Sequence, residues 1–466
     1  MLEQLRNIVG AANVLTGNDT AKWARDWIGK YSSDPLAVVR PANTSEVSEV
    51  VKLANQTGTP IVPISGNTGL AGGGLADGSI MVSVDRMNAI REVRPSSRIA
   101  IVEAGAILSD VHNAAEAKDL IFPLTFGAKG SAMIGGVLAT NAGGSNVLRY
   151  GNTRDLVLGI EAVLPTGEIM EIMSELHKDN SGYNLKHLLI GAEGTLGIIT
   201  AAVLKLHPRP KAYATAMVAA PDLPAALDLL NRLQEATGGC VEAFEYMPRD
   251  HIELHQQINP NAREPFDAAY DVNILVEVGA TAPRDATPEP DGSIPVTTHL
   301  ETVLAEMFEE EAVLDAVVAQ NDTQRQQMWE RREAAAEIAM SRSPIIGNDI
   351  ALPLDKVANF LSIMETRLPE VDPGARPIIV AHLGDGNIHY TVWPGSQDPD
   401  QHDAIMEAVE DEVLKLGGSF SAEHGIGLSK LPSMRRRKNP VALAAMKAIK
   451  AALDPNNILN PGKLLP

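Results

Sequence analysis

The chain has 466 residues, 45% of them apolar, and a formal charge of −20 at pH 7. This length exceeds what one hydrophobic core supports, so we expect two or three domains. The negative charge argues against binding to nucleic-acid phosphates. No apolar run is long enough to predict a transmembrane segment. The single cysteine, Cys240, excludes an internal disulfide and a cysteine-based metal site, and its flanks predict a buried structural thiol at the start of a strand.

The first half of the chain alternates predicted helices and strands. Residues 1–33 read as a polar helix with Trp23 and Trp27 on one face, and its early acidic residue argues against a targeting peptide, so we expect a cytoplasmic protein. A helix should begin at Thr44 or Ser45, either of which can cap it. Apolar runs predict strands at 60–64, 80–84, 99–103, 157–164 and 167–173. A short helix is predicted after them, at 182–191.

The second half predicts a different arrangement, with longer helices and strands that can pair in an antiparallel sheet. We expect this sheet to carry its helices on one face. The Pro-, Thr- and Gly-rich residues 282–296 read as an exposed loop. The predicted elements are helices at 221–236, 301–340 (interrupted near residues 321–322) and 401–416, with strands at 240–246, 345–352, 376–382 and 388–393.

Three glycine-rich segments, residues 63–74, 131–145 and 191–200, each lie beside a strand-like apolar run. Glycine has no Cβ, so backbone N–H groups in such loops can close around an anion. Each loop alone is equally compatible with a tight turn. Together they favour backbone wrapped around one large ligand, such as a dinucleotide. None forms the strand, Gly-x-Gly-x-x-Gly and helix unit of a nicotinamide-binding domain, and the chain has no phosphate-loop motif.

Two histidines lie on either side of a strong hairpin signal, Asp385 followed by Gly386. A two-residue turn there would place His382 directly opposite His389, with Cβ atoms roughly 4.5–5.5 Å apart on one face of the sheet. Two imidazoles at that spacing can hold a divalent metal, and Glu423 can complete a two-histidine, one-carboxylate set. The alternative is that both histidines are structural residues with satisfied hydrogen bonds.

These motifs carry a resemblance to a known family. The three glycine-rich segments look like the FAD-binding domain of the vanillyl-alcohol oxidase type. Residues 382–389, 423–427 and 459–463 resemble the branch of the D-2-hydroxy-acid dehydrogenases, which includes D-lactate, glycolate and D-2-hydroxyglutarate dehydrogenases. The resemblance implies an α+β fold with a two-part FAD-binding domain, residues 1–209 and a returning segment 421–466, and a substrate or cap domain, residues 210–420.

The resemblance also implies which residues contact FAD. Covalent members usually carry His in the first glycine loop or Cys near the second. Here Asn67 and Thr68 occupy the first loop and Cys240 lies far from the second, so we expect non-covalent FAD. The expected contacts come from all three segments and the C-terminus: Pro63, Ser65, Gly66, Asn67, Thr68, Gly69, Ser131, Gly135, Gly136, Thr140, Asn141, Gly143, Gly144, Ser145, Gly194, Ile199 and Asn460.

Two further residues take catalytic roles by resemblance. His424 matches the family's general base, a role that suits an imidazole because its pKa lies near neutrality; the alternatives are a second metal ligand or a structural histidine. Arg332 matches the arginine that clamps the substrate carboxylate, with the planar fork that this work needs. Arg331 is the alternative clamp, and either arginine could instead form a surface salt bridge.

The resulting hypothesis is oxidation of a D-2-hydroxy acid to the 2-oxo acid by hydride transfer to FAD, with a divalent metal at the hydroxyl. Zinc is the expected ion, with manganese or cobalt as alternatives. The expected electron acceptor is an electron-transfer flavoprotein, a cytochrome or a quinone, and a homodimer is one option for assembly. The alternatives are a flavin oxidase or reductase acting on another alcohol, or a flavin-binding subunit of a larger complex. Gly347 and Asn348 replace a basic residue common in the hydroxyglutarate enzymes, which puts the grip on a distal carboxylate in doubt.

Overall fold

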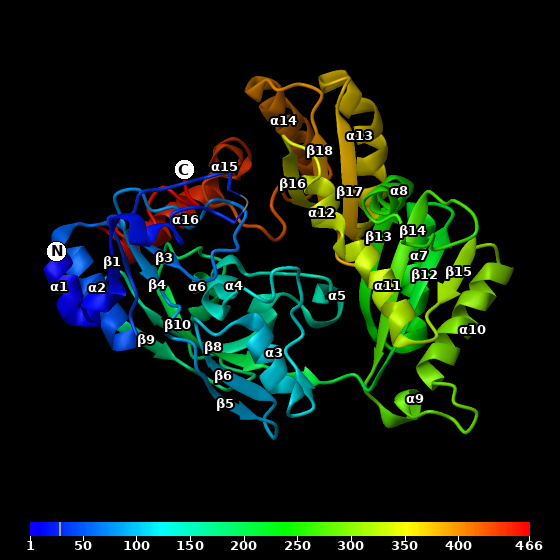
Figure 1. Ribbon diagram of the computed structural model, residues 1–466, viewed down its shortest axis with the longest axis horizontal. Coiled ribbons are helices and arrows are strands. Elements are labelled where there is room, and N and C mark those ends of the chain that lie inside the picture. The colour runs from blue at the N-terminus through cyan, green and yellow to red at the C-terminus, as the bar shows by residue number, and fades with distance from the viewer. Residues whose placement is uncertain (28) are drawn as a thin grey trace. The chain divides into compact units, whose positions relative to one another are not determined.

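The computed structural model describes residues 1–27 and 29–466, and the chain folds into two compact units (Figure 1). Unit 1 contains Met1–Gly143, Gly151–Arg209 and Glu423–Pro466, and unit 2 contains Gly144–Tyr150 and Pro210–Ala422. The expected boundaries of 1–209, 210–420 and 421–466 differ from these in two places. The short segment Gly144–Tyr150 belongs to unit 2, and unit 2 extends to Ala422.

Unit 1 is built on two sheets whose strands have the order β1-β2-β4-β3 and β5-β6-β10-β8-β9, with a small β11-β7 pair beside them. In the first sheet β4 is parallel to both β2 and β3, whereas the second sheet is antiparallel. The strands are β1 Val14–Leu15, β2 Ala37–Val39, β3 Ile61–Ile64, β4 Ile80–Ser83, β5 Ile90–Arg94, β6 Ile99–Glu103, β7 Leu120–Ile121, β8 Val157–Val163, β9 Ile169–Ile172, β10 Ile198–Lys205 and β11 His207–Pro208.

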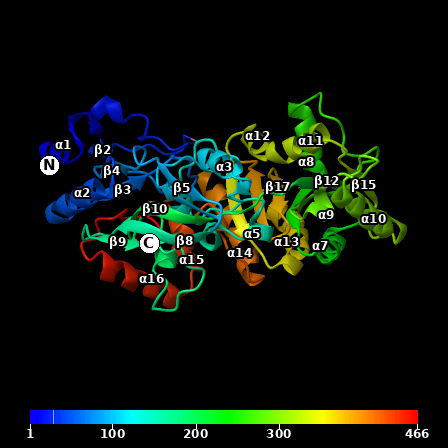
Figure 2. The same cartoon turned by 90° about the horizontal axis from the view of Figure 1, so that it is seen from below.

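The helices of unit 1 include two from the C-terminal segment, which returns to this unit (Figure 2). Residues Ile458 and Leu459 belong to the same hydrophobic core as helix α2 and strand β3. The backbone N–H of Ile61 donates to the carbonyl of Ile458, so the return is held by main-chain bonds as well. The helices are α1 Leu2–Val9, α2 Thr44–Thr57, α3 Leu108–Glu116, α4 Ile134–Thr140, α6 Lys186–Leu189, α15 Leu431–Arg437 and α16 Pro440–Leu453.

Unit 2 contains one seven-stranded antiparallel sheet with the strand order β15-β12-β14-β13-β17-β18-β16. Its strands are β12 Ala212–Ala220, β13 Val241–Pro248, β14 Val272–Ala280, β15 Asp315–Val318, β16 Ile346–Ala351, β17 Arg376–His382 and β18 Asn387–Trp393. Its helices are α5 Val147–Tyr150, α7 Leu223–Thr237, α8 Arg249–Ile258, α9 Pro283–Ala286, α10 Pro295–Glu309, α11 Asp322–Glu333, α12 Ala335–Met340, α13 Val357–Val371 and α14 Pro399–Lys415.

The main helical layer of unit 2 covers one face of this sheet, as expected. Helices α7, α10, α13 and α14 bury their apolar residues against this face. Helix α7 shows why: the Asp222 side chain caps it by accepting from Ala225 N–H, Gly238 ends it at φ 62°, and Leu229, Leu230 and Leu233 face the sheet. Helices α8, α11 and α12 pack on part of the opposite face. The remaining part of that second face carries polar side chains.

The predicted strands are present, but several helical predictions were wrong. Beyond Val9, most of the first 33 residues are not α-helical; Trp23 is buried and Trp27 is 57% exposed, so they do not form one packed face. Ile28, in the same predicted helix, lies outside the described residues. The cap of α2 is Asn43, not Thr44 or Ser45. Cys240 is a free, half-buried thiol.

Three other segments differ from their predictions, because the pattern of neighbouring residues does not show which distant segments they contact. Only Lys186–Leu189 is helical within 182–191. The predicted loop at 282–296 contains the short helix α9. The predicted helix at 301–340 is broken by the edge strand β15, which pairs with β12. Among the described residues, no helix combines the length and apolar character that crossing a bilayer requires.

Candidate active site

The three glycine-rich segments meet in unit 1. Strand β3 ends at Ile64 and runs into the first segment, where a Cβ on Gly66 would lie 2.2 Å from the carbonyl oxygen of Ser131 in the second. A Cβ on Gly194, in the third segment, would lie 2.9 Å from Pro63. Gly66 is therefore required because backbone passes where a side chain would stand, and Gly194 because it has φ 71° and the Pro63 ring lies against it.

The first segment offers free donors. Within the described part of the chain, none of the backbone N–H groups of residues 66–69 donates a hydrogen bond to another protein group. Asn67 adopts φ 53°, and its side-chain amide donates to the carbonyl of Arg25, which holds this turn. Consecutive unpaired N–H groups in such a turn fit a bound anion.

The side chains expected around FAD divide into two kinds. Thr140 and Asn141 support the second segment itself: the Thr140 hydroxyl donates to Gly136 O, and Asn141 Oδ1 accepts from Arg154 N–H. Asn460 is buried, and its amide donates to the carbonyls of Gly73 and Glu193. Its Oδ1 has no partner among the described residues, so a buried acceptor remains. Free N–H groups and this acceptor fit a large polar ligand with phosphates.

The remaining expected contacts lie on the same three segments. Gly135 closes on Ala104 and Ser65, and Ile199 is buried in β10. Gly144 and Ser145 belong to the short stretch of unit 2, whereas Gly143 ends the preceding part of unit 1. A Cβ on Gly143 would lie 2.6 Å from a carboxylate oxygen of Glu423, so the second segment contacts an expected metal ligand.

The polar part of the second sheet face in unit 2 carries the histidines. The hairpin between β17 and β18 has a longer loop than predicted, because His382 pairs with Asn387 and His389 pairs with Val380. The direct opposition of the two histidines was therefore wrong. The register differs from the predicted one by two residues, and an even shift keeps both histidines on the same face of the sheet. The histidines are diagonal neighbours with ring centroids 5.3 Å apart.

Glu245 is a site residue that the sequence analysis missed. It lies on β13 directly opposite His382 and is fully buried. Its carboxylate accepts from Arg332 Nε at 2.7 Å and lies 2.8 Å from His382 Nδ1. Burial opposes ionisation of Glu245, but His382 and Arg332 hold its pKa below the usual value. A charged residue in the predicted apolar strand 240–246 was the available signal.

The structure separates the two candidate clamps. Arg332 points at Glu245 and His382. Arg331 is buried elsewhere: its guanidinium donates to the carbonyl of Arg263, and its own carbonyl lies 2.8 Å from His251 Nε2. Only Arg332 therefore lies with the expected metal ligands of this unit. Burial lowers the pKa of His251 to about 4, so this imidazole is neutral in the folded protein.

Asp349 is a second missed residue. It pairs with His389 across β16 and β18, and a carboxylate oxygen lies within 4.8 Å of a His389 ring nitrogen. The Asn387 amide also donates to Asp349 Oδ1, and the turn residue Asp385 accepts from Asn387 N–H, so both residues stabilise the hairpin. Burial raises the pKa of Asp385 to about 6, with His382 acting against this shift.

The chain itself links this face to the motif at residues 423–427. Ala422, the last residue of unit 2, donates its N–H to the carbonyl of Asp349. Glu423 follows by one peptide bond, so its Cα lies within about 3.8 Å of that of Ala422. Ligand atoms of Glu423 and His424 lie within 4.8 Å of each other. Gly425 and Gly427 both have positive φ, and they supply the turn after His424.

Comparisons with known proteins agree with this architecture. Residues 35–173 match the family described as "FAD binding domain", and residues 209–464 match "FAD linked oxidases, C-terminal domain". The chain is 34% identical over 463 residues to the mitochondrial D-2-hydroxyglutarate dehydrogenase of Arabidopsis thaliana, covering 99% of this chain and 80% of the relative. It is 35% identical over 459 residues to the D-2-hydroxyglutarate dehydrogenase of Xanthomonas citri pv. viticola, covering 96% and 92%.

Solved structures show the same fold at low identity. p-Cresol methylhydroxylase with substrate bound superposes with a TM-score of 0.75 at 16% identity, covering 99% of this chain and 95% of that one. Alkyldihydroxyacetonephosphate synthase gives 0.72 at 17% identity, with coverages of 99% and 84%. The fold is therefore of the vanillyl-alcohol oxidase type, as predicted. The chain belongs to the FAD-linked oxidase family, in the branch of the D-2-hydroxy-acid dehydrogenases.

Proposed function

We propose that this protein oxidises a D-2-hydroxy acid to the 2-oxo acid, with non-covalently bound FAD and a divalent metal. The observation that carries the proposal is the set formed by Glu245, Arg332 and His382 on one sheet face, beside His389 and Asp349. A buried carboxylate that orients both an arginine and a histidine is the arrangement expected where an anionic substrate meets a metal.

Arg332 is the group we assign to the substrate carboxylate. Its Nε donates to Glu245, while its Nη2 makes a longer contact of 3.5 Å with His382 Nδ1. The outer edge of the guanidinium therefore keeps donors for a bidentate contact with a carboxylate. Glu245 fixes the direction in which those donors point.

His382, His389 and Glu423 are the proposed metal ligands, with Asp349 as an additional carboxylate. The contact of His382 Nδ1 with Glu245 leaves Nε2 as the ligand atom, which is the usual way a carboxylate orients a metal-binding imidazole. Glu423 follows Ala422, the last residue of unit 2, by one peptide bond. A divalent ion in such a set supplies a Lewis acid for the substrate hydroxyl, and nitrogen and oxygen ligands favour zinc.

His424 is the proposed base for the hydroxyl proton, and Gly425 lets the chain turn away directly after it. FAD supplies the acceptor for the substrate hydride when it is bound. The electrons then pass to a carrier other than a nicotinamide, such as an electron-transfer flavoprotein, a cytochrome or a quinone. The family resemblance and the absence of a nicotinamide-binding motif in the sequence support this part.

The substrate side chain is where this chain departs from the hydroxyglutarate enzymes. Gly347 lies on β16 opposite Thr391, two residues before Asp349 and on the same face. A Cβ there would meet nothing within 4 Å. The relatives are named for 2-hydroxyglutarate, but this position has no side chain to hold a second carboxylate, so D-lactate and other monocarboxylates belong in the same assay.

The test is a panel of D- and L-2-hydroxy acids with a dye acceptor, run with and without chelator. We expect turnover with D-acids only and its loss after chelation, while FAD stays bound and is released by acid precipitation. The variant His389→Ala should lose metal by elemental analysis, whereas His299→Ala, a histidine of α10, should keep it. Full activity of a metal-free protein would contradict the metal assignment.

A further inference from the structure

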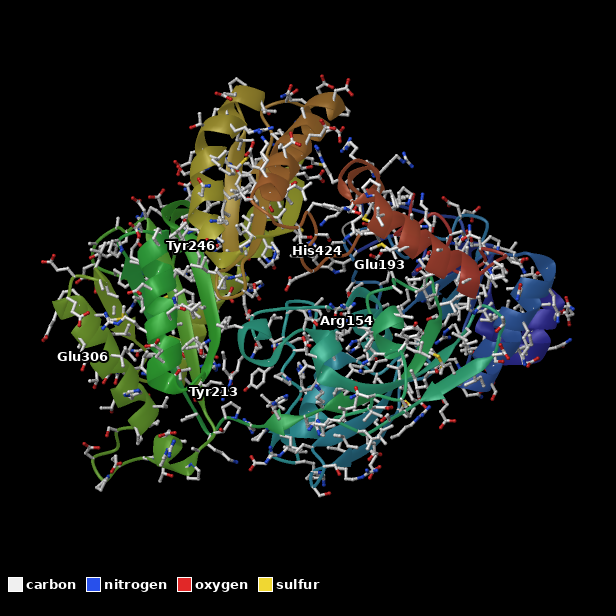
Figure 3. All side chains as sticks on the ribbon, turned by 180° about the vertical axis from the view of Figure 1, so that it is seen from behind. Arg154, Glu193, Tyr213, Tyr246, Glu306 and His424 are labelled. Atoms are coloured by element: carbon white, nitrogen blue, oxygen red, sulfur yellow. The ribbon has the colours of Figure 1, made fainter. Side chains whose placement is uncertain are left out.

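The Glu193 carboxylate is the point where the third glycine-rich segment meets the motif that carries His424 (Figure 3). One carboxylate oxygen accepts from Ile426 N–H and the other from Gly427 N–H, each at 2.7 Å. These are the second and third peptide groups after His424. Two charge-assisted bonds to consecutive N–H groups fix the orientation of a turn more strongly than one neutral bond.

The backbone of Glu193 is itself fixed by hydrogen bonds to its N–H and its carbonyl. It adopts φ 51°, which is uncommon for a residue with a side chain. Its N–H donates to the carbonyl of Ala139, and its carbonyl accepts from the buried amide of Asn460. A left-handed residue persists where the surroundings determine it, and such residues gather at functional sites. The carboxylate is therefore presented from a fixed support.

The close contact leaves no room for a side chain at the two glycines of the motif. A Cβ on Gly425 would lie 2.7 Å from a Glu193 carboxylate oxygen, and one on Gly427 would lie 2.2 Å from the carbonyl of Ala71. Leu428 N–H also donates to that carbonyl. The turn after His424 is thus enclosed between Glu193 and the first glycine-rich segment.

We propose that Glu193 is a positioning residue for His424. It joins a segment expected to hold the flavin to the turn that carries the base, so the direction of the imidazole depends on this carboxylate. The inference rests on the proposed function, since it requires His424 to be the base. It assigns Glu193 no contact with substrate.

The direct test is Glu193→Gln, which keeps the shape but places an amide NH₂ against one of the two N–H donors. We expect the rate of flavin reduction at saturating substrate to fall about 10- to 100-fold, the usual consequence of misplacing a reacting group. FAD content and the substrate dissociation constant should change little, and the pH profile of flavin reduction should shift. Glu46→Gln is the matched control, because Glu46 on α2 also accepts a hydrogen bond from a backbone N–H, that of Ala42.

A double-mutant cycle with His424→Ala separates positioning from general damage. If Glu193 acts through His424, Glu193→Gln should add little loss in the His424→Ala background. Additive losses, or a wild-type reduction rate in Glu193→Gln alone, would overturn the inference. A His424→Ala protein that reduces flavin at the wild-type rate would instead overturn the proposed function.

Should Glu193→Gln lose FAD or fail to fold, Gly425→Ala addresses the same contact from the other side. Its added Cβ would push against the intact Glu193 carboxylate. We expect the same fall in reduction rate with FAD retained. A folded, FAD-containing Gly425→Ala protein with unchanged kinetics would count against the positioning role.

Discussion

Helix α11 carries three arginines, and two of them, Arg325 and Arg332, lie about two turns apart and each bind a glutamate of the adjacent sheet. Arg325 binds Glu277 through Nε and Nη2 at 2.7 and 2.6 Å, and the same carboxylate accepts from Trp329 and Thr215. Arg332 binds Glu245 through Nε, and the other carboxylate oxygen faces His382. The first glutamate is occupied by structural donors, whereas the second orients the proposed carboxylate clamp and a proposed metal ligand.

This difference separates a structural ion pair from a functional one. A bidentate pair whose carboxylate also accepts from two further structural donors contributes rigidity. In the second pair Arg332 binds Glu245 through Nε alone, and the same carboxylate contacts His382, a proposed metal ligand. Two arginines on one helix therefore have different roles. The number of hydrogen bonds that each partner glutamate accepts distinguishes the two pairs better than burial does.

The largest expected effect comes from Arg332→Met. It removes the proposed carboxylate clamp and leaves Glu245 with His382 as its remaining partner, so kcat/KM with a D-2-hydroxy acid should fall roughly 10²- to 10³-fold. Arg325→Met is the matched control on the same helix and should keep kcat/KM within a few-fold. Equal losses in both variants would erase the distinction between the two pairs.

Glu277→Leu should act on stability and leave chemistry in place. Removing one partner of a buried ion pair costs about 3–5 kcal/mol of unfolding free energy, and we expect the lower end because the Arg325 side chain is 31% exposed. Urea unfolding measures this loss. The folded variant should reduce its flavin at nearly the wild-type rate. A large kinetic defect would contradict the purely structural role assigned to Glu277.

Glu245→Gln should weaken metal binding. Changing the partner that orients a metal-bound histidine typically lowers metal affinity 10- to 100-fold. Competition with a chelator, followed by elemental analysis, measures this change. Glu277→Gln should bind metal as the wild type does, and an unaltered affinity in Glu245→Gln would remove His382 from the ligand set.

The smallest effect concerns His251, whose ring supports the carbonyl just before Arg332. Burial lowers its folded-state pKa to about 4, below the value of 6.5 expected when unfolded. The unfolded chain therefore binds the proton first as pH falls. The contribution of neutral His251 to the free energy of unfolding is thus complete above pH 6.5 and is lost as the pH falls towards 4. At pH 5.5 the loss should be about 1 kcal/mol. His251→Gln should flatten this part of the stability profile.

How far the sequence predicts this molecule differs between fold and site. Apolar runs predicted strands such as β3, β8 and β17, because burial imposes a pattern that can be read locally. The helix expected at 301–340 failed because β15 is defined by its pairing with β12. The histidine face was correct while its register was not, since side-chain alternation is fixed by the pleat and loop length is not.

Glu245 shows why part of the site could not be predicted. Its partners Arg332 and His382 lie 87 and 137 residues away in the chain, and nothing local specifies such a contact. Glu193 is similar, because it joins segments that only the fold brings together. The glycine-rich segments were more accessible to prediction, since a demand for positive φ or close backbone approach leaves its mark on composition.

The central claim is that His424 removes the hydroxyl proton while a D-2-hydroxy acid reduces bound flavin. Stopped-flow absorbance of His424→Ala, mixed with saturating substrate in the absence of an electron acceptor, isolates that step. We predict a reduction rate roughly 10²- to 10⁴-fold below that of the wild type, with FAD and metal retained. A variant that reduces its flavin at the wild-type rate would contradict it.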